Sequence, residues 1–150
     1  MKRNTRKRRT RKNKSGGSNN SKMEIRYNSF VVDNNITTAR NTSSVPKIML
    51  YPMKYSTLVM YDPDAVTPAW LHYLVINIPN GDITKGDVII PYAGPSPPPG
   101  TGTHHYIFEH LSQTSPFNIS ISERSGFDIN EFKQQNNLVS RAKKQFIVEA

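Results

Sequence analysis

The chain is 150 residues long, contains no cysteine and carries a formal net charge of +9 at pH 7. It therefore forms neither disulfides nor thiolate metal sites, and its length favours one domain with its own hydrophobic core. No apolar run approaches the roughly 18 residues of a membrane-spanning helix, and the N-terminus lacks the apolar core of a signal peptide. We expect a cytoplasmic, monomeric protein without a transmembrane segment.

The positive charge is concentrated at the start of the chain. Residues 1–22 hold ten Lys and Arg and no acid, whereas residues 23–150 hold the other ten against all 11 acids, a net charge of −1. Between Lys2 and Lys22 there is no aliphatic or aromatic side chain, and residues 15–20 (Ser-Gly-Gly-Ser-Asn-Asn) have linker composition. We predict a disordered basic tail and linker over 1–22. Such a tail is a candidate for nuclear import or for binding nucleic acid or an anionic membrane surface.

From Met23 onward, short apolar segments alternate with turn residues. Segments rich in Val, Ile, Tyr and Phe and bounded by Gly, Pro and Asn are typical of β-strands. Tight turns are expected at residues 80–82 and at residues 125–126. The predicted strands are Glu24–Val32, Lys47–Tyr51, Ser56–Tyr61, Trp70–Ile78, Asp87–Ile90, His104–Leu111, Phe117–Ser122 and Gln145–Glu149.

One segment near the end of the chain predicts a helix. Asp128 is the expected N-cap, Glu131 completes a capping box, and Phe127 against Phe132 forms a hydrophobic staple, with the helix reaching about Val139. Eight short strands and one late helix predict an all-β sandwich or barrel with a helical appendage, over residues 23–150.

The stretch from Tyr61 to Tyr106 contains most of the residues capable of site chemistry. If residues 70–78 form a strand, Trp70, His72, Leu74 and Ile76 share one face, because side chains alternate with period two.

In a strand over 104–111, His104, Tyr106 and Phe108 likewise share a face, and His105 points the other way. The alternation therefore predicts that His72 and His104 converge on one pocket beside the carboxylates of Asp62 and Asp64, without His105.

Two other functions remain open at this point. Carboxylates and histidines are ligands for metal ions, so a metalloenzyme or hydrolase using the same Asp/His cluster is one alternative, although no His-x-x-x-His pair and no Gly-x-Ser-x-Gly elbow is present. The other is a nucleic-acid-binding protein that works through its tail and has a vestigial pocket.

The motifs of this stretch resemble those of the phosphatidylethanolamine-binding proteins. The first is Thr-Leu-Val-Met-Tyr-Asp-Pro-Asp-Ala at 57–65, followed by Trp-Leu-His-Tyr-Leu-Val-Ile-Asn-Ile-Pro at 70–79. The second is Tyr-Ala-Gly-Pro-Ser-Pro-Pro at 92–98, leading to Gly-Thr-His-His-Tyr-Ile-Phe at 102–108. The resemblance covers about residues 23–150. The chain departs from the family pattern at Val66, where a proline is usual, and at His105, where an arginine is usual.

The resemblance implies an antiparallel β-sandwich and a non-enzymatic binding module without a cofactor or metal. It implies a small pocket for a phosphate-type anion or phospholipid headgroup, and a kinase-type protein partner. Carried over by position, the ligand-binding residues are Asp62, Asp64, His72, Ser96, Pro97, Pro98, His104 and Tyr106.

Overall fold

The computed structural model describes residues 22–150, which form mostly β-structure with one short α-helix. Apart from Lys22, the predicted basic tail lies outside the described residues. In chain order the elements are β1 (Glu24–Arg26), β2 (Ile36–Thr37), the 3-10 turn η1 (Arg40–Thr42), β3 (Lys47–Met49), β4 (Tyr55–Asp62), β5 (Trp70–Pro79), the 3-10 turn η2 (Ile83–Lys85), β6 (Asp87–Ile90), β7 (Thr103–Ser112), α1 (Ile129–Gln135) and β8 (Val139–Glu149).

The strands form one large sheet and one small sheet. The large sheet has the order β2-β8-β7-β4-β5-β6, and β1 pairs with β3 in a separate two-stranded sheet. All neighbours are antiparallel except β2 and β8, which run parallel. Because β4 lies between β5 and β7, its C-terminal end at Asp62 meets the start of both neighbours.

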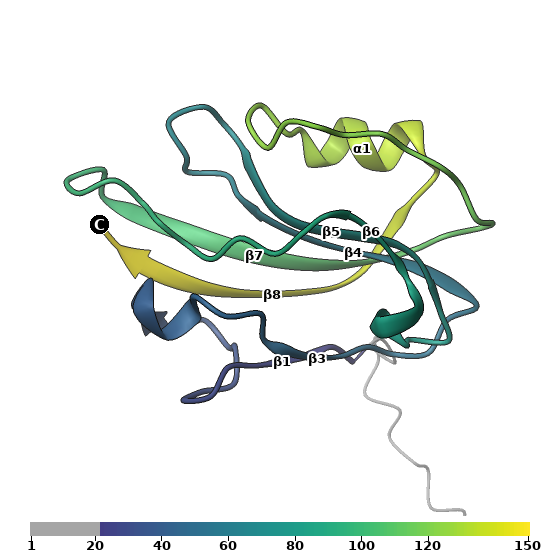
Figure 1. Ribbon diagram of the computed structural model, residues 1–150, viewed down its shortest axis with the longest axis horizontal. Coiled ribbons are helices and arrows are strands. Elements are labelled where there is room, and N and C mark those ends of the chain that lie inside the picture. Colours follow the sequence, from purple (N-terminus) through teal and green to yellow (C-terminus); the bar gives the residue numbers. More distant parts are fainter. Residues whose placement is uncertain (1–21) are drawn as a thin grey trace, which may run out of the picture.

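A hydrophobic core lies on each face of the large sheet. On one face the pair β1–β3 covers a core that includes Ile25, Leu58, Phe108 and Phe146. On the other face, helix α1 and the chain before it cover a second core around Leu74 and Phe132 (Figure 1). Burial of these side chains is the main source of stability, about 1.5–3 kcal/mol for each large apolar group.

The centre of the sheet was predictable, because its strands carry long apolar runs. Strands β4, β5 and β7 match the predicted segments to within two residues at each end, and β6 matches at both ends. The helix start is also confirmed. The Asp128 side chain accepts hydrogen bonds from the backbone N–H groups of Asn130 and Glu131 at 2.9 and 3.1 Å, and the rings of Phe127 and Phe132 lie 5.4 Å apart.

Two predictions about the helix were wrong. Its last residue is Gln135 rather than about Val139, because Asn137 adopts a left-handed backbone conformation (φ 53°) and β8 begins immediately afterwards. The Glu131 carboxylate accepts from the Gln135 side chain at 3.0 Å, so the capping box is only half formed.

Three strand predictions need correction. The first strand ends at Arg26, because the chain turns back and the Tyr27 N–H donates to the Phe30 carbonyl at 2.9 Å. Residues 117–122 form no strand, since the side chain of Asn77 satisfies both the N–H and the carbonyl of Phe117 at 3.0 and 2.8 Å. The last strand begins six residues before the predicted start, and the short β2 was not predicted.

The predicted alternation within β5 was also wrong. The pairing of β4 with β5 skips His72, since Met60 pairs with Tyr73 and Tyr61 pairs with Leu71. This bulge leaves both Leu71 and Leu74 in the core beneath α1, while the ring of His72 meets that of Tyr106, which belongs to the opposite core. His72 therefore does not share a face with Leu74 and Ile76.

Candidate functional site

A cavity of about 460 Å³ opens where the end of β4 meets the starts of β5 and β7. Antiparallel pairing brings these three strand ends together, so residues far apart in the sequence share one wall. The cavity is lined by Asp62, Ala65, Val66, Thr67, Trp70, His72, Ala93, Gly94, Ser96, Pro97, Pro98, His104, Tyr106 and Arg124.

A buried histidine–carboxylate pair forms the inner wall. His104 Nδ1 donates to Asp62 Oδ2 at 2.7 Å, and the two side chains are 1% and 5% exposed. The other ring nitrogen, Nε2, lies 2.7 Å from the Thr101 hydroxyl, which donates to the Pro98 carbonyl at 2.6 Å. The ring of His104 is therefore held between a carboxylate on one side and a hydroxyl on the other.

His72 is held in one orientation by the proline-rich loop. Its Nδ1 donates to the carbonyl of Ala93 at 2.7 Å, which leaves Nε2 for a ligand. Burial lowers the pKa of His72. Arg124 also lowers it, whereas the hydrogen bond to Ala93 and the charge of Asp62 act in the opposite direction. The free site therefore favours a neutral His72.

The ring of Tyr106 lies near the rings of both histidines. Its ring stacks on that of Phe146 at 5.2 Å, meets the ring of His72 edge-on at 5.2 Å and lies 6.4 Å from the ring of His104. Burial raises the pKa of Tyr106, and the charges of Asp62 and Asp64 raise it further. The phenol therefore stays protonated at neutral pH and donates hydrogen bonds.

The loop over residues 91–98 forms the opposite wall. The Ala93 N–H donates to the His72 carbonyl at 2.9 Å, and the Tyr92 hydroxyl donates to the Thr42 carbonyl at 2.7 Å. Gly94 is needed here because a Cβ atom at this position would lie 2.9 Å from Ser43 Cα. These contacts hold the Ser-Pro-Pro segment over the cavity.

The family model of the phosphatidylethanolamine-binding proteins matches residues 19–149. The chain belongs to this family. Among solved structures, a carboxypeptidase Y inhibitor complexed with its cognate proteinase is 20% identical, with 87% of this chain and 84% of that chain covered and a TM-score of 0.78. A phosphatidylethanolamine-binding protein from Plasmodium vivax is 23% identical, with 85% and 84% covered and a TM-score of 0.70. One from Plasmodium falciparum is 20% identical, with 86% and 85% covered and a TM-score of 0.65. At these identities the likeness shows the fold.

In this member of the phosphatidylethanolamine-binding protein family, seven of the eight predicted site residues line the cavity, and Asp64 does not. The Asp64 N–H donates to Asp62 Oδ1 at 2.8 Å, so the chain turns at Pro63 and the two carboxylates part. The Asp64 carboxylate instead accepts from the backbone N–H and the Nδ1 of His105, at 2.8 and 2.7 Å. His105 lies away from the cavity, as the alternation in β7 predicted.

The sequence analysis missed Arg124 as a site residue. Its guanidinium donates to the carbonyls of His72 and Pro91 at 3.0 and 2.8 Å, and so joins β5 to the proline-rich loop. Burial lowers the pKa of Arg124, yet a guanidinium remains charged at neutral pH. A single Arg before the Ser125-Gly126 turn gives no periodic signal, and we had expected a strand just before it.

Nowhere in residues 22–150 do three or more His, Asp or Glu side chains cluster closely enough to hold a metal ion. Over the same range no helix has the length and apolar character needed to cross a membrane.

Proposed function

We propose that this protein is a non-catalytic binding module that holds a phosphate-type anion in the cavity between β4, β5 and β7. The anion is either free or the headgroup of a phospholipid. The observation that carries the proposal is the set of donors and cations at one cavity: Tyr106, His72, His104 and Arg124, with Asp62 as the only lining carboxylate.

The charges in the cavity support an anion. Asp62 already accepts from the imidazole of His104 at 2.7 Å, and the guanidinium of Arg124 offsets its negative charge on the cavity wall. The Tyr106 hydroxyl supplies a donor, and the free nitrogen of His72 supplies another once it is protonated. Charge-assisted hydrogen bonds of this kind are the strong ones in proteins.

Calorimetry with inorganic phosphate, phosphoethanolamine and a short-chain phosphatidylethanolamine tests the proposal. If a free anion is the ligand, phosphate binds at least as tightly as the two larger compounds. If a headgroup is the ligand, the larger compounds bind more tightly. His72→Ala and Tyr106→Phe each should cost about 1.5–3 kcal/mol of binding, the scale of a hydrogen bond to a charged group.

His105→Ala is the matched control, because it removes an imidazole one residue from His104 that lies outside the cavity. We expect little effect on binding. The proposal fails if none of the three compounds binds, or if His105→Ala is as damaging as His72→Ala.

We extend the proposal to the regulation of a protein partner of the kinase type. The support is the family to which the chain belongs and the fold it shares with an inhibitor that binds a proteinase. A kinase domain immobilised for surface binding should retain the protein, and phosphate should change its affinity if the cavity controls the interaction. If the protein is retained no better by the kinase domain than by an uncoated surface, the proposed kinase-type partner is wrong.

One observation favours a second candidate, a hydrolase. The Thr101 hydroxyl, His104 and Asp62 are connected in series, each step at 2.7 Å, in the order of a nucleophile, a base and an orienting acid. This function needs the hydroxyl proton turned from Pro98 toward His104, which would then be neutral.

The two candidates therefore require different proton positions, which nitrogen NMR of the labelled imidazole distinguishes. Hydrolysis of p-nitrophenyl acetate or p-nitrophenyl phosphate that disappears in Thr101→Val would establish the hydrolase. Turnover unchanged by Thr101→Val would rule out Thr101 as its nucleophile.

A further inference from the structure

The domain that follows the basic tail is almost neutral in sum but not in distribution. A groove of about 950 Å³ runs between the pair β1–β3 and strand β8. Four cationic side chains line it, from Lys22, Arg141, Lys143 and Lys144, together with one acid, Glu24. Glu24 already pairs with Arg26 at 3.4 Å. The groove is therefore a concentration of positive charge on the folded domain.

Two further hollows also hold cationic side chains. One, of about 340 Å³, lies on the far side of Lys143 and Lys144 and contains one acid, Asp33. The other, of about 710 Å³, is lined by Arg26, Arg40 and Lys47 and contains no acid. Together the three hollows hold seven of the 11 Lys and Arg in residues 22–150 and only two of the 11 acids.

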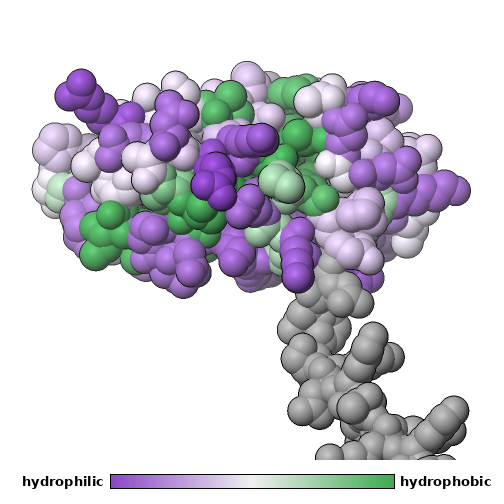
Figure 2. Space-filling view, turned by 90° about the horizontal axis from the view of Figure 1, so that it is seen from below, coloured by the Kyte–Doolittle hydropathy of each residue, from purple (hydrophilic) through white to green (hydrophobic). Residues whose placement is uncertain are grey.

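This face also exposes apolar and aromatic groups. Met49 is 55% exposed and Tyr51 is 39% exposed, and both line the groove. The view from below, over β1 and β3, shows hydrophobic patches between long hydrophilic side chains (Figure 2). A groove that combines cations with an exposed aromatic ring is typical of proteins that bind single-stranded nucleic acid, where bases stack on the ring and cations follow the phosphates.

The chain outside the described residues adds to the same charge. Lys22 forms part of the groove wall, and residues 1–21, which join it directly, contain nine further Lys and Arg and no acid. A basic groove next to a sequence with so many further cations matches a long polyanion better than a small ligand.

We propose that the groove between β1–β3 and β8 binds the phosphate backbone of single-stranded nucleic acid without sequence preference, with Tyr51 as a stacking platform. The groove is a second concentration of positive charge beside that of residues 1–22. It is separate from the anion cavity, with which the groove shares no lining residue.

Two simpler roles for these cations account for fewer of the residues. Lysines on strand edges prevent sheets from pairing edge to edge, which explains Lys143 and Lys144 on β8 but not Tyr51 or Lys22. An anionic membrane attracts the same cations, but a bilayer surface contacts protruding side chains, whereas these cations line a concave groove.

The test uses the full chain, a short fluorescein-labelled single-stranded DNA and a salt titration. Lys143→Glu is compared with Lys85→Glu, which makes the same charge change at an exposed lysine on η2, outside all three hollows. We expect Lys143→Glu to weaken binding at least about fivefold more than Lys85→Glu at low salt. The slope of log affinity against log salt should also fall by about 0.7 for each phosphate that the variant no longer neutralises.

Tyr51→Ala tests the stacking platform. It should weaken binding about fivefold or more and leave the salt slope unchanged, because stacking releases no counterions. Val88→Ala is the control, an exposed apolar side chain on β6 that lies outside the groove. Photo-crosslinking of the full chain to DNA containing 5-iodouracil should label the peptide that contains Tyr51.

Three outcomes overturn the proposal. The first is an equal effect of Lys143→Glu and Lys85→Glu, and the second is crosslinking confined to residues 1–21. The third is binding to phosphatidylserine vesicles that depends on Lys143 and Tyr51 while DNA binding does not, which would assign the face to a membrane instead.

Discussion

The carboxylate of Asp62 accepts a hydrogen bond from the imidazole of His104 across 42 residues of sequence, at 2.7 Å and almost without exposure to solvent. The pair joins the last residue of β4 to the second residue of β7 and lines the cavity between β4, β5 and β7. Because the ring of His104 is hydrogen-bonded on both sides, the pair is as much a part of the fold as of the site.

Replacing Asp62 with Ala should therefore destabilise the protein strongly. The change leaves the buried imidazole of His104 without its partner, and breaking a buried pair in this way costs about 3–5 kcal/mol. Urea denaturation at neutral pH measures the loss of unfolding free energy.

Asp64→Ala is the matched control for that experiment. Asp64 also bonds a histidine at 2.7 Å, but both side chains of the Asp64–His105 pair are 38% exposed. Solvent screens such a pair, and we expect a loss below about 1 kcal/mol. Equal losses of unfolding free energy for the two variants would show that burial does not make the Asp62–His104 pair stronger than the exposed pair.

Gly94→Ala should disturb the wall of the cavity. The added Cβ would lie 2.9 Å from Ser43 Cα and 3.0 Å from the Thr42 carbonyl oxygen, and backbone atoms give way less readily than side chains. We expect about 1–3 kcal/mol of destabilisation and weaker anion binding, because the loop that orients His72 must move. If Gly94→Ala had the melting temperature and the anion affinity of the native protein, the loop would accommodate the Cβ atom without moving.

The sequence predicts the site residues on β7 better than His72 on β5. His104 and Tyr106 follow from regular alternation in β7, whose pairing with β4 is unbroken from Ser56 to Tyr61. His72 reaches the cavity for another reason, since it occupies a bulge that the pattern of apolar residues does not mark. The convergence of the two histidines was thus predicted through an alternation that β5 does not have.

Turn geometry and tertiary contacts decide what the sequence could not. A single Pro63 sends Asp64 toward His105, although both carboxylates look equivalent in the sequence. Arg124 acts through backbone carbonyls of β5 and the proline-rich loop, and those contacts exist only once the fold has formed. The charged face likewise draws on segments around β1, β3 and β8 that are far apart in the chain.

Anion affinity should rise as the pH falls, through His72. The pKa of His72 lies below its ordinary value in the free protein, so the ring is neutral near pH 7. A bound anion favours the protonated ring, so binding takes up a proton and tightens as the pH approaches the free-state pKa from above.

Sulfate is the suitable probe, because it does not titrate in this range. Calorimetry in buffers of different ionisation enthalpy measures the proton uptake, and His72→Gln should abolish the part due to His72. Affinity that is flat with pH in the native protein would contradict this assignment.

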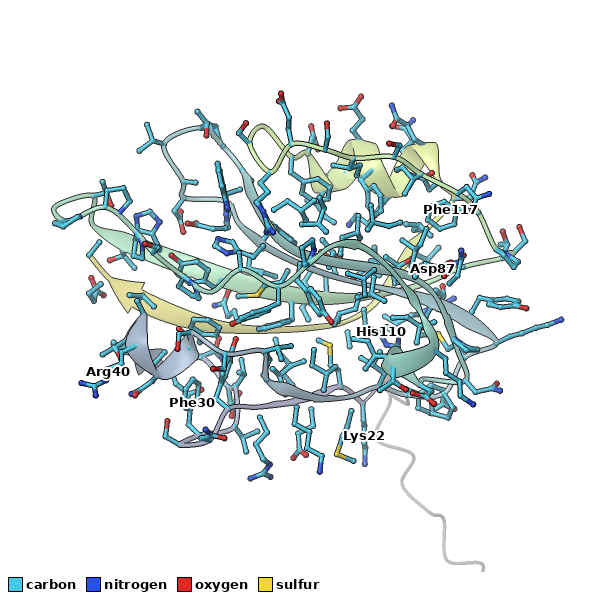
Figure 3. All side chains as sticks on the ribbon, in the orientation of Figure 1. Lys22, Phe30, Arg40, Asp87, His110 and Phe117 are labelled. Carbon is cyan, nitrogen blue, oxygen red and sulfur yellow. The ribbon has the colours of Figure 1, made fainter. Side chains whose placement is uncertain are left out.

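The stability of the fold should depend on pH through His110. This side chain points from β7 toward the core beneath β1–β3 and is fully buried (Figure 3). Neither of its ring nitrogens has a hydrogen-bond partner in the part of the chain that the structure describes. Burial lowers the pKa of His110 to about 4, against an ordinary value near 6.5.

The unfolded chain therefore takes up a proton first as the pH falls below about 6.5, whereas the folded chain does so only near the lowered pKa. Stability due to this residue is fully present above that range and is lost between about pH 6.5 and pH 4, by an amount on the order of 3 kcal/mol.

His110→Leu keeps a side chain of similar size and removes the titration. Its unfolding free energy should fall less steeply with decreasing pH than that of the native protein, whereas His105→Ala should follow the native curve far more closely. Urea denaturation at several pH values compares the three proteins, and parallel curves for His110→Leu and the native chain would show that His110 is not buried in its neutral form.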